Sequence, residues 1–189
     1  MAAVARPTSR RGSDGITLLE LVTVMGIVGI LTAIAVPSFR YMATANRIAG
    51  EDNGLLGDVQ FARAEAVKEG QSVSVCVSSN GAACLTGAGN NSWNKGWIVF
   101  SDVNGNGSLD AGTDILLKVQ APFSGSDTFV AGNSVNVITF NREGFATGLG
   151  ANAVITLHAA PATTASTRCL TVSRIGLTAV QGYDGTTCL

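Results

Sequence analysis

Side chains that could carry out catalysis are scarce in this chain of 189 residues. The one histidine, His158, ends the run VITLH, and no Cys, Asp or Glu stands within three residues of it. Catalytic and metal-binding histidines need such neighbours, so we expect a buried or solvated histidine without a catalytic role. No nucleophile, base and orienting group stand together, and there is no phosphate-binding loop. We therefore expect no enzymatic activity and no cofactor.

Four cysteines could form two disulfides, and they are Cys76, Cys84, Cys169 and Cys188. Four cysteines allow three pairings. The pairing with the shortest loops joins Cys76 to Cys84 and Cys169 to Cys188. A disulfide that closes a 15-residue loop contributes about 3 kcal/mol in the chain-entropy model, so the second bond would hold the C-terminal segment in place. A zinc site is the weaker alternative, because zinc ligands usually stand in closer pairs.

Oxygen-bearing side chains recur in the segment DVNGNGSLDAGTD, residues 102–114. The alternating donors match the first half of a Ca²⁺-binding loop, and they are Asp102, Asn104, Asn106 and Asp110. The bidentate Glu that closes such a loop is absent, because Thr113 occupies its position. We therefore favour a β-hairpin loop in which Asn-Gly pairs supply positive φ angles, and calcium binding stays as the alternative.

Glu20 is the one charged residue in an apolar run from Ile16 to Val36. A helix of about 21 residues, at ~1.5 Å per residue, spans roughly 30 Å, which is the hydrocarbon thickness of a bilayer. A carboxylate inside such a helix costs roughly 2.5–3.5 kcal/mol, so its presence needs a reason. Arg6, Arg10 and Arg11 precede the run, which predicts a cytoplasmic N-terminus and a remainder outside the membrane.

Three interpretations of this segment compete. It is a plain membrane anchor, a secretory signal removed after Ala33-Ile34-Ala35, or a helix freed from its leader by a cut after Gly15. The third interpretation gives Glu20 a partner, because the cut creates an α-amino group on Ile16. Where such helices stack, the amine of one can face the carboxylate of its neighbour. At ~4 Å and an effective dielectric constant near 20, that pair gains about 4 kcal/mol, enough to offset burial.

A long helix over residues 17–69 is predicted to carry these groups. Pro37 should kink the helix or free a backbone carbonyl, and Gly70 should end it. Its second half has one apolar face, interrupted by Asp52, that comprises Ile48, Leu55, Val59, Ala62 and Ala66. Arg47 and Glu51 are expected to pair on a more exposed face.

Three glycines in this half, Gly50, Gly54 and Gly57, each weaken a helix by ~1 kcal/mol relative to Ala. We expect a sheet to pack closely over them.

The hydrophobic period becomes two after residue 71, which predicts strands. The candidates are residues 72–77, 97–100, 115–120, 135–140, 154–157 and 169–172. Trp93, Trp97 and Phe100 are expected in the core. The fold class is therefore α+β, a long helix packed on a mainly antiparallel sheet. We divide the chain into a leader (1–15), a transmembrane helix (16–36), an amphipathic half of the helix (37–70) and a β-rich domain (71–189).

The N-terminal motif resembles a known processing signal. The segment Gly15-Ile16-Thr17-Leu18-Leu19-Glu20, the apolar helix and Pro37 resemble the class III signal of type IV pilins and type II secretion pseudopilins. The resemblance implies cleavage after Gly15 by a prepilin peptidase, N-methylation of Ile16 and a subunit-docking role for Glu20. The chain departs from the family's pattern at Ile16, where Phe is commonest, and at Asp14, where a basic residue is more usual.

The rest of the chain is similar to the GspH/FimT family of minor pilins and pseudopilins. The similarity rests on VQFARAEAVKEGQSVSVC (59–76), KGWIVFSD (95–102) and the loop 102–114. It implies the pilin fold and a low-abundance subunit near the filament tip that helps to initiate or cap assembly. The implied partners are other pilins or pseudopilins, the prepilin peptidase and lipid of the bacterial inner membrane, with the β-rich domain in the periplasm. The sequence leaves open whether the filament serves secretion or a pilus.

Two other functions stay open as alternatives. Some FimT-like minor pilins serve DNA uptake and resemble one another in a C-terminal Gly-Arg-x-Arg patch. The matching stretch here is Gly176-Leu177-Thr178-Ala179, with only Arg168 and Arg174 nearby. Two positive charges bind phosphates weakly, and the whole chain has a net charge of −1, so nucleic acid is not an expected partner. The other alternative is a secreted soluble protein released after Ala35.

Overall fold

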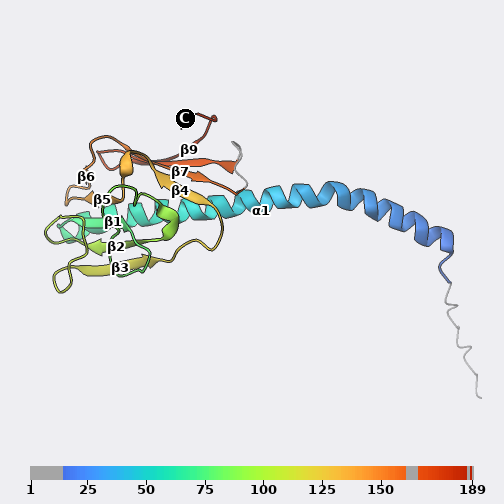
Figure 1. The fold of residues 1–189 in the computed structure, drawn as a ribbon, viewed down its shortest axis with the longest axis horizontal. Coiled ribbons are helices and arrows are strands. Elements are labelled where there is room, and N and C mark those ends of the chain that lie inside the picture. Colours follow the sequence, from blue (N-terminus) through green and yellow to red (C-terminus); the bar gives the residue numbers. More distant parts are fainter. Residues whose placement is uncertain (1–14, 161–165, 187, 189) are drawn as a thin grey trace, which may run out of the picture. The chain divides into compact units, whose positions relative to one another are not determined.

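One long helix, α1 (Leu18–Glu69), leads into a β-rich domain. The computed structural model describes residues 15–160, 166–186 and 188. By its contacts the chain forms two compact units, Met1–Met42 and Ala43–Leu189, and α1 begins in the first and ends in the second (Figure 1). The predicted helix over residues 17–69 is therefore confirmed to within one residue.

The strands of the second unit form two antiparallel sheets. Among the described residues they are β1 (Val73–Val77), β2 (Trp97–Ser101), β3 (Ile115–Gln120), β4 (Thr128–Ala131), β5 (Val137–Phe140), β6 (Ala146–Thr147), β7 (Ala153–His158), β8 (Arg168–Val172) and β9 (Thr178–Gly182). Short 3₁₀ turns lie at Trp93–Lys95 (η1) and Gly132–Ser134 (η2). One sheet has the order β3-β2-β1-β5-β6 and the other β4-β7-β8-β9. The expected α+β class is confirmed, with two sheets in place of one.

The six predicted strands are all present, with ends that move by at most two residues. Three strands were not predicted: β4, β6 and β9. Each is short or sits at a sheet edge, where one side of the strand has no neighbour to demand apolar residues. β6, for example, comprises only Ala146 and Thr147 and pairs with the end of β5.

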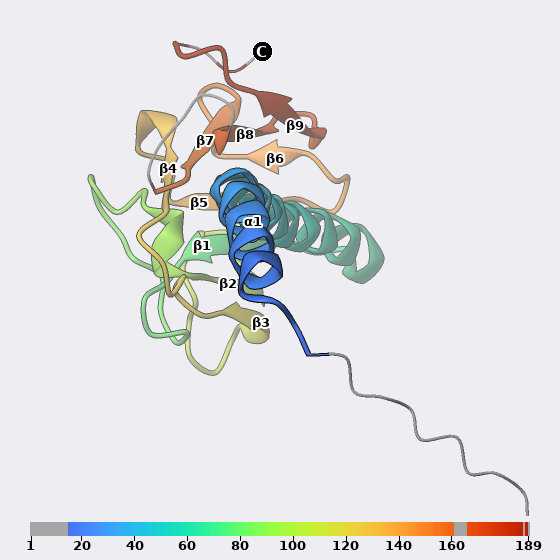
Figure 2. The same ribbon diagram turned by 90° about the vertical axis from the view of Figure 1, so that its right-hand side faces the viewer.

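The second half of α1 packs its predicted apolar face against both sheets. Every predicted member of that face is buried, and so is Asp52, which lies in the middle of it. Ile155 and Leu170 of the second sheet share this core with Val75 and Val99 of the first. Figure 2, seen close to the helix axis, shows the strands curving around one side of α1. The buried face of α1 therefore forms one core with residues of both sheets.

Two expectations for this half of the helix are wrong. Arg47 does not pair with Glu51; its guanidinium lies 2.7 Å from the Asp127 carboxylate, across the domain. Asp127 is fully buried, so it is the acid that most needs a cation. Gly50, Gly54 and Gly57 lie on the exposed side of α1, and a Cβ at each would meet nothing within 4 Å. No sheet covers them.

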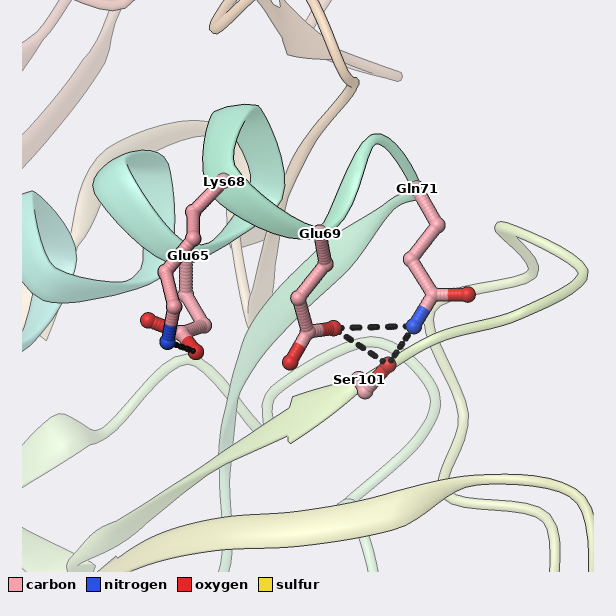
Figure 3. Close-up of polar contacts among 5 residues, drawn as sticks. All are labelled: Glu65, Lys68, Glu69, Gln71 and Ser101. Atoms are coloured by element: carbon pink, nitrogen blue, oxygen red, sulfur yellow. Dashed lines mark hydrogen bonds and ion pairs between the residues drawn. The ribbon is translucent and has the colours of Figure 1, made fainter.

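Gly70 ends the helix as predicted, in the left-handed region with φ +70. The chain is fastened there by a small polar cluster (Figure 3). The Glu69 carboxylate accepts hydrogen bonds from the Gln71 amide at 2.8 Å and from the Ser101 hydroxyl at 3.1 Å. The same Gln71 amide donates to the Ser101 hydroxyl at 2.6 Å. These contacts join the end of α1 to the strands β1 and β2 that follow it.

Candidate functional site

Apolar side chains cover the first part of α1 on all sides. Between Ile16 and Met42 the large apolar residues have exposed fractions from 48% at Val36 to 81% at Leu18. In the described part of the chain, α1 is the one helix long and apolar enough to cross a membrane, and its most apolar stretch is not buried. A helix that is hydrophobic all round is normally covered by lipid or by other helices. This segment therefore needs a partner that the single chain does not supply.

Glu20 lies in the first turn of this helix. The Thr17 hydroxyl accepts a hydrogen bond from the Glu20 backbone N–H at 3.2 Å, which makes Thr17 the N-cap. The Thr23 hydroxyl donates to the Glu20 carbonyl oxygen at 2.9 Å. The Glu20 carboxylate itself has no hydrogen bond or ion pair with any residue that the structure describes. The partial positive charge of a helix N-terminus favours a carboxylate at this place.

The predicted cleavage site lies just before the helix. Gly15, Ile16 and Thr17 are exposed and belong to no helix or strand. A peptide bond in such a segment can enter a protease without prior unwinding of a helix. The predicted leader up to residue 14, with Arg6, Arg10 and Arg11, lies outside the described residues.

Pro37 lies inside α1, which is assigned as helical on both sides of it. Proline has no N–H, so the carbonyl of Ala33 loses its usual helical donor. The predicted kink stays a prediction.

The cysteines pair as the shortest loops predict, Cys76 with Cys84 and Cys169 with Cys188, with Cα–Cα distances of 5.6 and 5.9 Å. The first disulfide belongs to a small apolar cluster with Ile98 and Phe100, on the face of the first sheet away from α1. The second disulfide joins Cys169 of β8 to Cys188 in the C-terminal segment. Cys188 also forms a β-bridge with Tyr183. Among the described residues no cysteine is free.

The loop 102–114 connects β2 to β3, which pair antiparallel, as the hairpin interpretation expects. Its carboxylates are already occupied by N–H donors. Asp102 accepts from the backbone N–H groups of Asn106 and Gly107 at 3.0 and 2.8 Å. Asp110 accepts from the side-chain amides of Asn104 and Asn106 at 2.9 and 2.8 Å. The described residues contain no group of three or more acidic, His or Cys side chains arranged to hold a metal.

On α1, Asp52 is buried and Glu51 is partly buried, and neither has full hydrogen bonding; the sequence pattern placed Asp52 on the apolar face but gave it no role. Burial raises the pKa of Asp52, and Arg168 lowers it in part. Burial also raises the pKa of Glu51, as does the nearby Asp127 carboxylate, while Arg47 opposes them. One oxygen of each acid, Asp52 Oδ1 and Glu51 Oε2, has no hydrogen-bond partner. Asp52 stands at a position where the helical period of α1 requires a core residue, so the sequence pattern indicated that this carboxylate is buried.

The remaining candidates have no catalytic arrangement. His158 Nδ1 lies 3.2 Å from the Thr167 hydroxyl, and its ring packs edge-on against Tyr183. Arg168 begins β8, and Arg174 lies in the tight turn after the end of that strand, so the two residues stand at opposite ends of β8. They do not form one basic patch. Trp93 and Trp97 are buried as expected.

Comparison with known proteins identifies the family. The sequence model of the family described as Type II transport protein GspH matches residues 53–176, well over half of the chain. The chain belongs to the GspH family. Pilin-like protein PilA1 of Thermus thermophilus is 32% identical over 102 residues, which are 53% of this chain and 55% of PilA1. The chain thus spans about half the length of this curated relative.

Solved structures place the GspH-family chain in the type IV pilin fold. The type IV minor pilin FimU of Pseudomonas aeruginosa matches in two crystal forms. One form gives a TM-score of 0.51 at 20% identity, over 72% of this chain and 91% of FimU. The other gives 0.53 at 19% identity, over 80% and 96%. At this identity the likeness shows the fold: one long N-terminal helix on antiparallel sheets. A single apolar N-terminal helix in a GspH-family protein fits a membrane-anchored pilin. Pilins are a family of structural proteins.

Proposed function

We propose that this protein is a minor pilin or pseudopilin that joins a type II secretion pseudopilus or a type IV pilus through its N-terminal helix. The observation that carries the proposal is Glu20. Its carboxylate lies on a helix whose exposed apolar surface suits lipid, and it has no partner among the described residues. In lipid such a group costs roughly 2.5–3.5 kcal/mol unless it is paired.

The pairing group comes from processing. A prepilin peptidase cuts between Gly15 and Ile16, in the exposed segment ahead of α1, and the new amino group of Ile16 becomes N-methylated. A methylated amine still carries a positive charge. In the filament the Ile16 amine of one subunit faces the Glu20 carboxylate of its neighbour, and at ~4 Å this gains about 4 kcal/mol. The pair thus makes the filament, in which Glu20 is paired, more favourable than the membrane, in which Glu20 is unpaired.

Membrane placement follows from the same segment. The helix crosses the bacterial inner membrane once, with the arginines of the leader in the cytoplasm. The β-rich domain lies in the periplasm, where its two disulfides persist because the compartment is oxidising. As a member of a family of minor subunits, the protein takes part in initiating or capping the filament.

Replacing Glu20 with Ala tests the docking role. The variant should still insert into the membrane, because the apolar segment is unchanged, but its recovery with sheared filaments should fall about tenfold or more. Thr23→Ala is the matched control: it changes an exposed polar residue one turn away and should leave recovery unchanged. Normal recovery of Glu20→Ala in filaments would refute the docking role.

A further inference from the structure

A second exposed apolar surface lies in the Ala43–Leu189 domain, where α1 ends. It is built from the last turns of the helix and two tight turns of the chain. We call it the turn patch and define it as Arg63, Val67, Phe145, Arg174, Ile175 and Leu177. Its four apolar side chains are 47–59% exposed. Exposed apolar side chains that gather at one place on a domain surface often mark a contact site.

The two turns that present the patch are closed by backbone hydrogen bonds. In the first, Gly144 N–H donates to the Asn141 carbonyl at 2.8 Å. In the second, Gly176 N–H donates to the Ser173 carbonyl at 2.9 Å. Ala146 N–H donates to the Arg174 carbonyl at 3.0 Å and thereby ties the turns to each other. Phe145 and Ile175 are thus held beside one another by the backbone.

Close packing makes the patch rigid. Gly176 has φ +80, and a Cβ there would overlap the carbonyl oxygen of Gly144. Arg63 Nε donates to that same carbonyl at 3.0 Å, which joins α1 to the first turn. The surface therefore exists before any partner arrives, and binding would cost little ordering entropy.

Two shallow hollows lie at the turn patch. One, of about 550 Å³, is lined by Phe145, Leu149, Arg174 and Ile175 among others. The other, of about 610 Å³, is lined by Arg63, Val67 and Leu177 among others. Each hollow thus combines apolar walls with one guanidinium group.

The charges of the patch are unbalanced. Arg142 and Lys68, which lie close by in the chain, are neutralised by Glu143 at 2.8 Å and Glu65 at 2.6 Å. Arg63 and Arg174 form no ion pair within the described part of the chain. A complementary surface would present carboxylates to the guanidinium groups of Arg63 and Arg174. It would present apolar side chains to the four apolar residues of the turn patch. Arginine and aromatic residues around an apolar centre are also the composition of protein interfaces.

We propose that the turn patch docks a second subunit of the same filament, through an apolar surface of that subunit that carries carboxylates. This inference rests on the proposed function, since it requires the protein to enter a filament. A nucleic acid is the poorer fit, because its affinity grows with the number of phosphates neutralised, and among the described residues the turn patch offers only two guanidinium groups without an ion pair. The helix around Glu20 and the turn patch are then separate contacts of one subunit.

Site-specific photocrosslinking tests the proposal. A benzophenone amino acid replaces Leu177 in the full chain, produced in its native host and irradiated in cells. The matched control places the same amino acid at Val103, which is 51% exposed but lies in the 102–114 loop. We expect crosslinks from position 177, and not from 103, to another pilin-type subunit, on a peptide that contains Asp or Glu. Equal crosslinking at both positions, or crosslinks from 177 only to DNA or lipid, would overturn the proposal.

Charge reversal provides a second test. Arg174→Glu should lower crosslinking from position 177 about tenfold, and replacing the partner's carboxylate with Arg should restore it. Arg174 is exposed, so the variant should fold as the wild type does. If wild-type protein is absent from filaments, both the proposed function and this inference fail. If it is present and Arg174→Glu crosslinks as well as the wild type, this inference alone fails.

Discussion

Replacing Asp52 with Asn should stabilise the β-rich domain at neutral pH. Asp52 is 2% exposed and its Oδ1 has no hydrogen-bond partner. Burial raises its pKa, and the opposing attraction of Arg168 does not cancel that effect. The charged form is therefore unfavourable in the folded state. Asn has a similar shape and carries no charge, so it removes the desolvation of the carboxylate.

The effect should depend on pH in a defined direction. The unfolded chain has an Asp pKa of about 3.9, and that of folded Asp52 is higher. Stability from this group is therefore greatest below the unfolded pKa and is lost as pH rises toward the folded pKa. The advantage of Asn should therefore be larger at pH 7.5 than at pH 4, where the carboxyl group is largely protonated in both states.

The size of the effect follows from the unpaired oxygen. A buried polar group without a partner costs about 1–3 kcal/mol, and Asn retains part of that cost, so we expect a gain of about 1–2 kcal/mol. In a chain of this length 1 kcal/mol corresponds to roughly 2–4 °C, so a gain of about 1–2 kcal/mol gives a rise in Tm of roughly 2–8 °C. The assay is thermal unfolding of the full chain in detergent, followed by near-UV circular dichroism at pH 7.5 and at pH 4.

Asp58→Asn is the matched control on the same helix. The Asp58 carboxylate accepts hydrogen bonds from Trp97 Nε1 at 2.9 Å and Lys118 Nζ at 2.8 Å, so it is fully partnered. Its replacement should lower the free energy of unfolding by about 1–2 kcal/mol. If Asp52→Asn is destabilising at pH 7.5, or if its effect is the same at both pH values, the reasoning about Asp52 is refuted.

Three further predictions concern the same domain. Gly57→Ala should raise stability by about 1 kcal/mol because its side of α1 is open, whereas Gly176→Ala should cost about 1–3 kcal/mol, measured by the same thermal unfolding; equal effects would contradict this. Cys188→Ser should expose the C-terminal segment to limited proteolysis and cost about 3 kcal/mol, and unchanged protease resistance would count against a stabilising bond. Arg47→Met leaves the buried Asp127 without its cation and should cost about 2–4 kcal/mol in denaturant unfolding; a neutral result would mean the pair is not formed.

Most of the fold followed from periodicity. The apolar face of α1 was predicted residue by residue, because a helix that packs on a sheet must repeat its core positions every three or four residues. The central strand β1 was found because its apolar residues alternate with smaller ones, and the structure buries both of its faces. The edge strand β9 was not predicted, because Thr178 and Gln181 stand beside its few apolar residues and none of its residues is buried.

Long-range polar contacts could not be predicted in the same way. Arg47 and Glu51 have the spacing of a helical ion pair, yet Arg47 bonds to Asp127 because that carboxylate is buried and Glu51 is not wholly so. The partner lies far along the chain, and no local pattern indicates it. The turn patch was missed for a similar reason, since it arises only when the turns at Gly144 and Gly176 are brought together beside Arg63. By contrast, the processing motif around Glu20 is local, so the sequence alone indicated it.

The most direct test of the account is the mass of the mature protein. Full-length chain produced in its native host would be purified from membranes or filaments and its N-terminal peptide identified by mass spectrometry. The account predicts a first residue of N-methylated Ile16, with the apolar helix retained. An N-terminus at Met1, which would leave Glu20 without the amine, or at Val36, which would remove the helix, would contradict it.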